Sequence, residues 1–196
     1  MEKPYSQACE NNKLPILAVL RQAFREARQV LEVGSGTGQH AVYFAGEMPH
    51  LSWQCSDLRA NHAGINAWLA DYPGSNLLPP VELDVAGTWP TQLFDAVYTA
   101  NTLHIMSWPH VQSFFQNLGA VLASGAVLAV YGPFNYQGQF TSASNAQFNE
   151  WLKEADPARG IRDFEAVNQL AENAGLQLLA DHAMPANNRL LLWQLV

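Results

Sequence analysis

The sequence predicts an α/β domain with a doubly wound, Rossmann-like sheet of about seven strands, helices on both faces and an antiparallel last strand. Strand-length apolar runs alternate with segments whose apolar residues recur at helical spacing, as is typical of parallel sheets. The last two apolar runs are too close for a helix between them, so they are expected to pair antiparallel. The 196 residues suit a single domain over 1–196.

The elements follow from local patterns. Apolar or β-branched runs predict strands at 29–33, 51–57, 81–85, 94–100, 126–131, 176–180 and 189–195. Helical spacing or a capping signal predicts helices at about 14–27, 39–47, 65–69 and 109–122, and others that begin at 144 and 163. Gly125 is expected to end the fourth helix, and Asn187-Asn188 to form the last turn.

Two segments stand outside this alternation. Residues 1–28 form an N-terminal segment and helix, and residues 132–165 form an insertion before the last strand pair. The insertion opens with a loop over 132–144 that mixes glycines, aromatic residues and small polar residues. Because loops beside a binding edge often carry function, we expect this insertion to be a mobile lid.

Composition excludes several function classes. Lys and Arg number 10 against 17 Asp and Glu, so the formal net charge is −7. This charge argues against nucleic acid or an anionic membrane as a partner. No apolar run is long enough for a membrane span, and the N-terminus lacks the apolar region of a signal peptide. We therefore expect a cytoplasmic protein that binds a small-molecule substrate, and the residues indicate no particular oligomeric state.

Cysteine and histidine usage argues against a metal site. The two cysteines, Cys9 and Cys55, cannot build a disulfide framework or a zinc site by themselves. The histidines show no metal-ligand spacing either. We expect no bound metal.

A glycine-rich loop, Gly34-Ser35-Gly36-Thr37-Gly38, follows the first predicted strand and opens a helix. Such loops let a backbone pass close to a ligand at the carboxyl ends of parallel strands, although a tight strand–helix turn would look the same. The spacing departs from the dinucleotide fingerprint G-x-G-x-x-G, because Gln39 stands after Gly38.

Three acids are predicted at three neighbouring strand ends: Glu32, Asp57 and Asp84. A carboxylate at Glu32 would repel a pyrophosphate but would attract a ligand with a positively charged amino group. A carboxylate at Asp57 can accept hydrogen bonds from both ribose hydroxyls, and Asp84 can accept one from the amine of adenine. Together the acids favour a nucleoside that carries an ammonium group.

These motifs resemble those of class I S-adenosylmethionine-dependent methyltransferases, with Glu32–Gly38 as the first motif and Asp57 and Asp84 as the second and third. The resemblance covers essentially the whole chain. It implies S-adenosyl-L-methionine as cofactor, S-adenosyl-L-homocysteine as product, and in-line methyl transfer to a small molecule. The cofactor-binding residues that it implies are Glu32, Gly34, Ser35, Gly36, Gly38, Asp57, Leu58, Asp84, Val85 and Asn101.

A closer resemblance is to one branch of these enzymes, the methyltransferase-like protein 26 branch. The matching segments are 10–17, 100–105, 131–136, 160–165 and 184–189. They indicate kinship but imply no particular substrate.

The residues that would contact the methyl acceptor carry less specific sequence signals. His104 is a candidate general base because its ordinary pKa lies near neutrality, and Tyr131 is the second catalytic candidate. A histidine or tyrosine that merely packs beneath the site would give the same pattern. Candidate substrate-binding residues are Asn11 in the N-terminal segment, the aromatic residues Phe134 and Tyr136, and the possible acid clamp Arg162 and Arg189.

Two other functions remain open at this point. One is a non-catalytic S-adenosylmethionine-binding protein that regulates or contacts a partner, because it would keep the same cofactor pocket. The other is a nicotinamide-dependent oxidoreductase, against which Glu32 and Gln39 both count.

Overall fold

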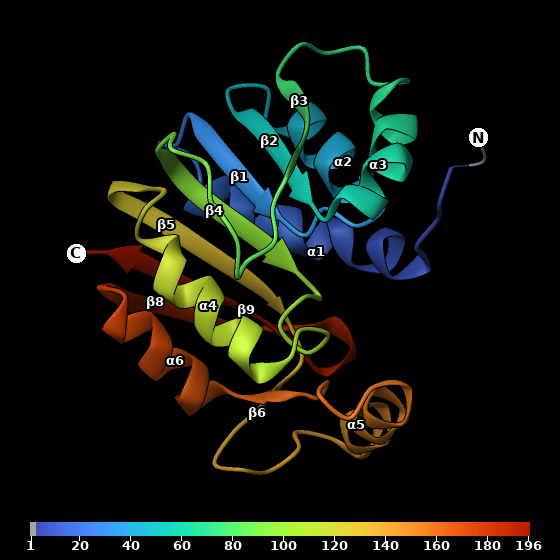
Figure 1. The fold of residues 1–196 in the computed structure, drawn as a ribbon, viewed down its shortest axis with the longest axis vertical. Coiled ribbons are helices and arrows are strands. Elements are labelled where there is room, and N and C mark those ends of the chain that lie inside the picture. The colour runs from blue at the N-terminus through green and yellow to red at the C-terminus, as the bar shows by residue number, and fades with distance from the viewer. Residues whose placement is uncertain (1–2) are drawn as a thin grey trace.

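The computed structural model describes residues 3–196 and confirms the predicted fold class (Figure 1). The main sheet has seven strands in the order β3-β2-β1-β4-β5-β9-β8, and β9 runs antiparallel to both of its neighbours. These strands are β1 (Gln29–Val33), β2 (Ser52–Asp57), β3 (Leu77–Glu82), β4 (Phe94–Ala100), β5 (Leu122–Gly132), β8 (Leu176–Met184) and β9 (Asn188–Leu195).

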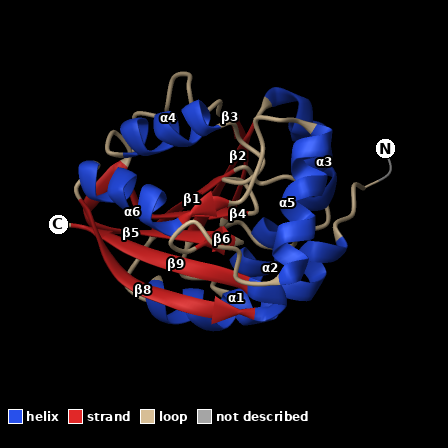
Figure 2. Cartoon of the chain, turned by 90° about the horizontal axis from the view of Figure 1, so that it is seen from below, coloured by secondary structure: helices blue, strands red, loops and turns tan. Residues whose placement is uncertain are grey.

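Helices cover both faces of this sheet. They are α1 (Gln7–Ala23), α2 (Gln39–Glu47), α3 (His62–Leu69), α4 (Trp108–Leu118), α5 (Ala143–Ala155) and α6 (Phe164–Asn173). Helices α4 and α6 pack on one face, and α1, α2 and α3 on the other (Figures 1 and 2). Helix α5 lies apart from both layers, beyond the carboxyl ends of the central strands (Figure 1). None of the helices among residues 3–196 is long and apolar enough to cross a membrane.

The two cores follow from the two-residue repeat of the strands. On β4, Val97 packs in the core beneath α4 and α6, whereas Ala96 and Tyr98 pack in the core of α1, α2 and α3. Leu128 and Ala129 of β5 divide in the same way. Central strands with apolar residues on both faces are what a covered parallel sheet requires.

The third strand was predicted wrongly at 81–85. The structure has β3 at Leu77–Glu82, which leaves Asp84 in the loop two residues beyond the strand. Pro79 and Pro80 lie inside β3, and prolines argue against a strand in the middle of a sheet. They are tolerated here because β3 is an edge strand, with β2 as its only neighbour.

The first helix begins at Gln7, seven residues before the predicted start. Ser6 caps it by accepting a hydrogen bond from the Cys9 backbone N–H at 3.3 Å. The first two turns lack an apolar stripe because their inner face, with Cys9 and Asn12, lines a cavity instead of the core. Helical periodicity therefore detected only the second half of α1, which packs on the sheet.

Gly125 is not a helix cap as predicted, because α4 ends at Leu118 and Gly125 lies inside β5. Its φ of +74° accompanies a register shift between β4 and β5, where Phe94 pairs with Leu122 but Ala96 pairs with Val127. The extra residues form a bulge, for which a glycine with positive φ is suited. The apolar residues at 121–122 were taken for a last helical turn but pack beside Phe94.

The insertion contains a two-stranded parallel sheet that the sequence did not reveal. Strand β6 (Phe134–Asn135) pairs with β7 (Arg162–Asp163), and Phe134 is buried in the core beneath α4. The predicted loop over 132–144 is therefore anchored at its start, whereas residues 137–141 are exposed. That the insertion moves as a lid stays a prediction.

The remaining corrections concern helix and turn ends. Helix α5 is capped by Ser142, which accepts from the Asn145 N–H at 3.1 Å, and not by Ser144 as predicted. In the last turn, Asn187 adopts a left-handed φ of +57° as expected, but Asn188 is extended. Ala186 takes the other left-handed position, also with a φ of +57°.

Candidate active site

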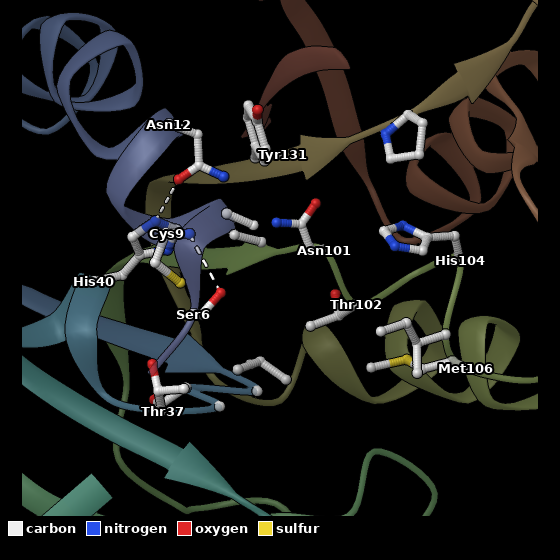
Figure 3. Close-up of a pocket in the computed structure, with 18 of the residues that line it drawn as sticks. Ser6, Cys9, Asn12, Thr37, His40, Asn101, Thr102, His104, Met106 and Tyr131 are labelled. Carbon is white, nitrogen blue, oxygen red and sulfur yellow. Dashed lines mark hydrogen bonds between the residues drawn. The ribbon is translucent and has the colours of Figure 1, made fainter. Parts of the chain in front are cut away.

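A cavity of about 970 Å³ opens at the carboxyl ends of the central strands. The glycine loop, the residues after β2 and β4, and the first turns of α1 line one part, and α5 with the turn before β9 lines the other. Figure 3 shows Ser6, Cys9, Asn12, Thr37 and His40 together on one side, with His104 and Met106 on the opposite side. The sheet therefore places this cavity where parallel α/β folds bind ligands.

The glycine loop needs glycine for two physical reasons. Gly34, Gly36 and Gly38 all have positive φ values, which side chains disfavour. A Cβ on Gly34 would lie 2.7 Å from Cγ2 of Thr102, and one on Gly38 would lie 3.2 Å from the Ile65 backbone. The glycines therefore permit a turn that passes close to two neighbouring segments.

Most N–H groups of the loop already have protein partners. The N–H groups of Gly34 and Ser35 both donate to the Ser56 carbonyl, at 3.0 and 2.9 Å. The Gly36 N–H donates to Oδ2 of Asp57 at 2.7 Å, and the Gly38 N–H to the Ser35 carbonyl at 2.9 Å. A dinucleotide loop presents such groups to a pyrophosphate, so this loop is poorly equipped for that anion.

Glu32 is a buried carboxylate at the end of β1. It points to the α1 and α2 face, where its Oε2 accepts from the Trp53 Nε1–H at 3.1 Å and from the Ser35 hydroxyl at 2.9 Å. No group among residues 3–196 donates a hydrogen bond to Oε1, and Glu32 lines the cavity. Burial raises the pKa of Glu32 to about 7, and the charge of Asp57 adds to the rise.

Asp57 ties the end of β2 to the glycine loop. In addition to the Gly36 N–H, it accepts from the Leu58 N–H at 2.7 Å and from Nδ2 of Asn61 at 2.8 Å. These contacts give Asp57 the alternative role of a turn former, and because Asp57 also lines the cavity, its contact with a ligand stays a prediction. Asp84 is exposed and accepts from the Ala86 N–H at 3.0 Å, while it still lines the cavity.

Helix α1 closes the cavity over the glycine loop through two buried contacts. Gln39, the residue that breaks the dinucleotide spacing, accepts from the Ser6 N–H at 2.6 Å and donates to Glu10 at 2.9 Å. Burial lowers the pKa of His40 to about 4, so its imidazole is neutral. Its Nδ1 then accepts from the Tyr98 hydroxyl at 3.2 Å, and its Nε2–H donates to Oδ1 of Asn12 at 2.7 Å (Figure 3).

Asn101 adopts a left-handed conformation at the floor of the cavity, with a φ of +57°. Its N–H donates to the Tyr131 carbonyl at 2.8 Å, which holds it between β4 and β5. Asparagine tolerates this conformation better than most residues, and such strain concentrates at functional sites. The hydroxyl groups of Thr102, the next residue, and Thr99 are hydrogen-bonded at 2.6 Å. The Thr102 methyl group packs against Gly34.

The two catalytic candidates both reach the cavity. His104 is buried, no group of residues 3–196 makes a hydrogen bond to its ring nitrogens, and it lines the cavity. Burial, reinforced by the nearby Arg162, lowers the pKa of His104 to about 4, so the imidazole is neutral. The Tyr131 hydroxyl accepts from Nδ2 of Asn188 at 3.0 Å, and burial raises the pKa of Tyr131.

Of the five predicted substrate-binding residues, only Asn11 lines the cavity. Phe134 lies in the core, and Tyr136 stacks on Phe164 and donates to Asp181 at 2.7 Å. Arg189 pairs with the same carboxylate at 2.6 Å. The geometry thus gives Phe134, Tyr136 and Arg189 no place beside a ligand.

Arg162 also stands outside the cavity lining. Its guanidinium donates to the carbonyls of Leu103 at 3.1 Å, of Ala158 at 2.9 Å, and of Met106. It therefore supports the backbone of the segment that carries His104 and does not offer a charge to a substrate. Arg162 and Arg189 therefore do not form the expected clamp for an acidic substrate.

Sequence reasoning missed several residues that line the cavity: Cys9, Thr37, His40, Thr102, Met106, Asn145, Phe148 and Trp151. Thr37 lies in the glycine loop and His40 in the first turn after it, a proximity in the sequence that could have indicated both. Those on α5 depend on where the insertion folds back, for which the sequence carries no local signal.

Comparison with known proteins identifies the fold family. An O-methyltransferase family protein from Burkholderia thailandensis superposes with a TM-score of 0.82 at 16% identity, over 93% of this chain and 55% of its own. Human N-acetylserotonin methyltransferase, solved with S-adenosylmethionine, superposes with a TM-score of 0.79 at 13% identity, over 96% of this chain and 52% of its own. An O-methyltransferase family 2 protein from Planctomyces limnophilus, solved with apigenin, superposes with a TM-score of 0.82 at 16% identity, over 95% of this chain and 58% of its own.

The chain spans about half the length of these structures, and identities this low show the shared fold alone. The fold is thus that of class I S-adenosylmethionine-dependent methyltransferases. A family model described as "Protein of unknown function (DUF938)" matches residues 3–195. With that match over nearly its whole length, the chain belongs to the DUF938 family, whose fold here is that of a class I methyltransferase.

Proposed function

We propose that this protein is an S-adenosylmethionine-dependent methyltransferase that methylates a hydroxyl group of a small molecule. The observation that carries the proposal is the buried Glu32, whose Oε1 is left for a ligand in a cavity beside Asp57. A buried carboxylate without a cation is unstable, so a ligand with an ammonium group would complete it. The O-methyltransferase names of the similar structures support a hydroxyl as the acceptor.

The residues present fit this cofactor. Glu32 would take its ammonium group, Asp57 the ribose hydroxyls, and Asp84 with Val85 the adenine edge. Leu58 is an apolar side chain that is 52% exposed yet lines the cavity, which suits a flat adenine ring. Gly34 and Gly36 would let the ligand lie close to the backbone, with Asn101 below it.

When bound, the cofactor would supply the methyl group, whose bond to sulfur breaks with its electron pair left on sulfur as the bond to oxygen forms. His104 would accept the hydroxyl proton, because it is neutral and has no other partner. A low pKa does not prevent this, since an oxygen that is being alkylated becomes a far stronger acid than imidazolium. Tyr131 would orient the acceptor by a hydrogen bond, while the enclosing walls exclude water.

Kinship with the methyltransferase-like protein 26 branch is part of the proposal. Four of the five segments that carry that resemblance, 10–17, 100–105, 131–136 and 184–189, contribute residues to the cavity wall, whereas 160–165 does not. A shared cavity wall is a reason for such segments to be similar.

Thermal unfolding with added ligands tests the cofactor. S-Adenosylmethionine and S-adenosylhomocysteine at a hundredfold excess over Kd should each stabilise the protein by about 2.7 kcal/mol. For a domain of this size that corresponds to a rise in Tm of roughly 5–11 °C. NAD in parallel should give no shift, because the loop amides are engaged and Glu32 repels a pyrophosphate. A shift with NAD alone would contradict the proposal in favour of an oxidoreductase.

Glu32→Gln should change stability and affinity in opposite directions. The folded protein holds the Glu32 proton up to a pKa of about 7, above the ordinary 4.5, so stability falls as pH rises from about 4.5 through 7. The variant escapes this loss and should be about 1–3 kcal/mol more stable than the wild type at pH 8, with little difference at pH 4. Urea melts of both proteins at both pH values measure this difference in the free energy of unfolding.

The same variant lacks the charge for the ammonium group, so S-adenosylhomocysteine should bind about tenfold or more weakly at pH 8. Calorimetric titration measures this. Unchanged affinity would remove Glu32 from the cofactor site, whatever happens to stability.

Asp57→Ala should weaken S-adenosylhomocysteine binding by about tenfold to a hundredfold, because two charge-assisted hydrogen bonds to ribose are lost. Asp95→Ala is the matched control: Asp95 also accepts two backbone hydrogen bonds, from Arg28 at 2.8 Å and Gln29 at 2.9 Å, but does not line the cavity. Both variants should lose roughly 1–3 kcal/mol of stability in urea melts. Equal affinities for the two variants would reduce Asp57 to a turn former.

A further inference from the structure

The part of the cavity opposite the glycine loop has an aromatic wall. His104 contacts Phe148 edge-on with ring centroids 5.5 Å apart, and Phe148 stacks on Trp151 at 5.7 Å with an interplanar angle of 15°. Phe148 and Trp151 are one turn apart on α5, so one face of that helix presents both rings. Met106 and Ile105 add apolar surface from the loop after β4.

Two of these apolar side chains are unusually exposed. Trp151 is 59% exposed and Ile105 is 46% exposed, although both line the cavity. Such large apolar side chains usually contribute to folding by burial, and these two do so only in part. A flat ligand that enters the cavity would cover them, and stacked rings add attraction beyond the area buried.

This part of the cavity holds no cation. No lysine or arginine stands among the lining residues of the described chain, and the two arginines expected to clamp an acid are engaged elsewhere. The imidazole of His104 is neutral. The carboxylates of the lining are Glu32, Asp57 and Asp84. Arg162, whose charge acts on His104, lies outside the lining and donates to backbone carbonyls, so an anionic acceptor would contact no cation in the cavity.

The lining offers neutral polar groups to an acceptor molecule. Among them are the ring nitrogens of His104, the amide of Asn101, to which no hydrogen bond from residues 3–196 is made, and the hydroxyl of Tyr131. The lining also includes His110, Ser144, Asn145 and Asn188. An anion placed here would lose its hydration without gaining a charged partner, which is costly. A single neutral hydroxyl is well served by the same groups.

We propose that the methyl acceptor is an uncharged, flat aromatic molecule with a hydroxyl group, stacked on the Phe148 and Trp151 wall with its hydroxyl at His104. The proposal rests on the proposed function and names its substrate class. It excludes anionic acceptors such as carboxylates and phosphates.

Paired probes test the proposal with intact protein. 2-Naphthol is uncharged and flat, and 6-hydroxy-2-naphthoate is the same hydroxylated ring with a carboxylate. Calorimetry on protein saturated with S-adenosylhomocysteine should show 2-naphthol binding at least tenfold more tightly. With S-adenosylmethionine instead, 2-naphthol should be methylated, as followed by the S-adenosylhomocysteine formed.

Three variants test the wall and the missing cation. Trp151→Ala should weaken 2-naphthol binding about threefold to tenfold, through lost stacking. Leu93→Ala is the control, because Leu93 is a large apolar side chain that is 55% exposed and lies outside both the cavity lining and the insertion, and the affinity of this variant should stay within twofold of wild type. Met106→Lys adds a cation and should raise the relative affinity for the naphthoate at least fivefold.

Two outcomes would overturn the substrate class. One is tighter or equal binding of the naphthoate by the wild type. The other is failure of 2-naphthol to bind a protein whose Tm rises with S-adenosylhomocysteine, because that rise shows an intact cofactor site. If S-adenosylhomocysteine itself gives no rise, the proposed function fails first, and the two failures are thereby distinguished.

Discussion

The burial of Glu32 at the end of β1 is the constraint on which the site depends. A carboxylate that is 2% exposed, and that among residues 3–196 accepts side-chain hydrogen bonds from Trp53 and Ser35, raises the free energy of the folded protein above neutral pH. The surrounding structure keeps it nonetheless: the glycine loop turns over it, and its other oxygen borders the cavity. The arrangement carries an electrostatic cost, and under the proposed function a cationic ligand would relieve it, so stability and binding would oppose each other at this residue.

The N-terminal helix completes this arrangement from outside the sheet. Gln39 occupies the position where a dinucleotide loop would continue to its third glycine, and its side chain binds the Ser6 backbone and Glu10 instead. His40 connects α1 to the buried Tyr98 through Asn12. This departure from a common motif thus docks the helix that forms one wall of the cavity.

The sequence predicted the half of the site that follows from strand ends. Glu32 and Asp57 could be found because an acid after a buried strand and beside a glycine loop has few structural explanations, and the carboxyl ends of parallel strands meet at one edge. The exact bounds of a strand mattered less for the site. The prolines of β3 led to a wrong prediction of its bounds, yet Asp84 lines the cavity. The fold class followed from alternation of elements, which tolerates such errors.

The other half could not be read from the sequence. Cys9 lies on a helical face that borders a cavity, and such a face shows no apolar period. Phe148 and Trp151 lie on α5, whose position depends on the short pairing of β6 with β7. Arg162 looked like a ligand clamp because a guanidinium pairs well with acids, but backbone carbonyls satisfy it equally.

Proton counting on ligand binding tests the central role of Glu32 most directly. Calorimetry of S-adenosylhomocysteine binding at pH 7, repeated in buffers of different ionisation enthalpy, gives the protons exchanged by the wild type and by Glu32→Gln. With a pKa of about 7, Glu32 is roughly half protonated before binding and ionised beside an ammonium group afterwards. The wild type should therefore release about half a proton more than the variant, whereas equal proton counts would show that no cationic group of the ligand meets Glu32.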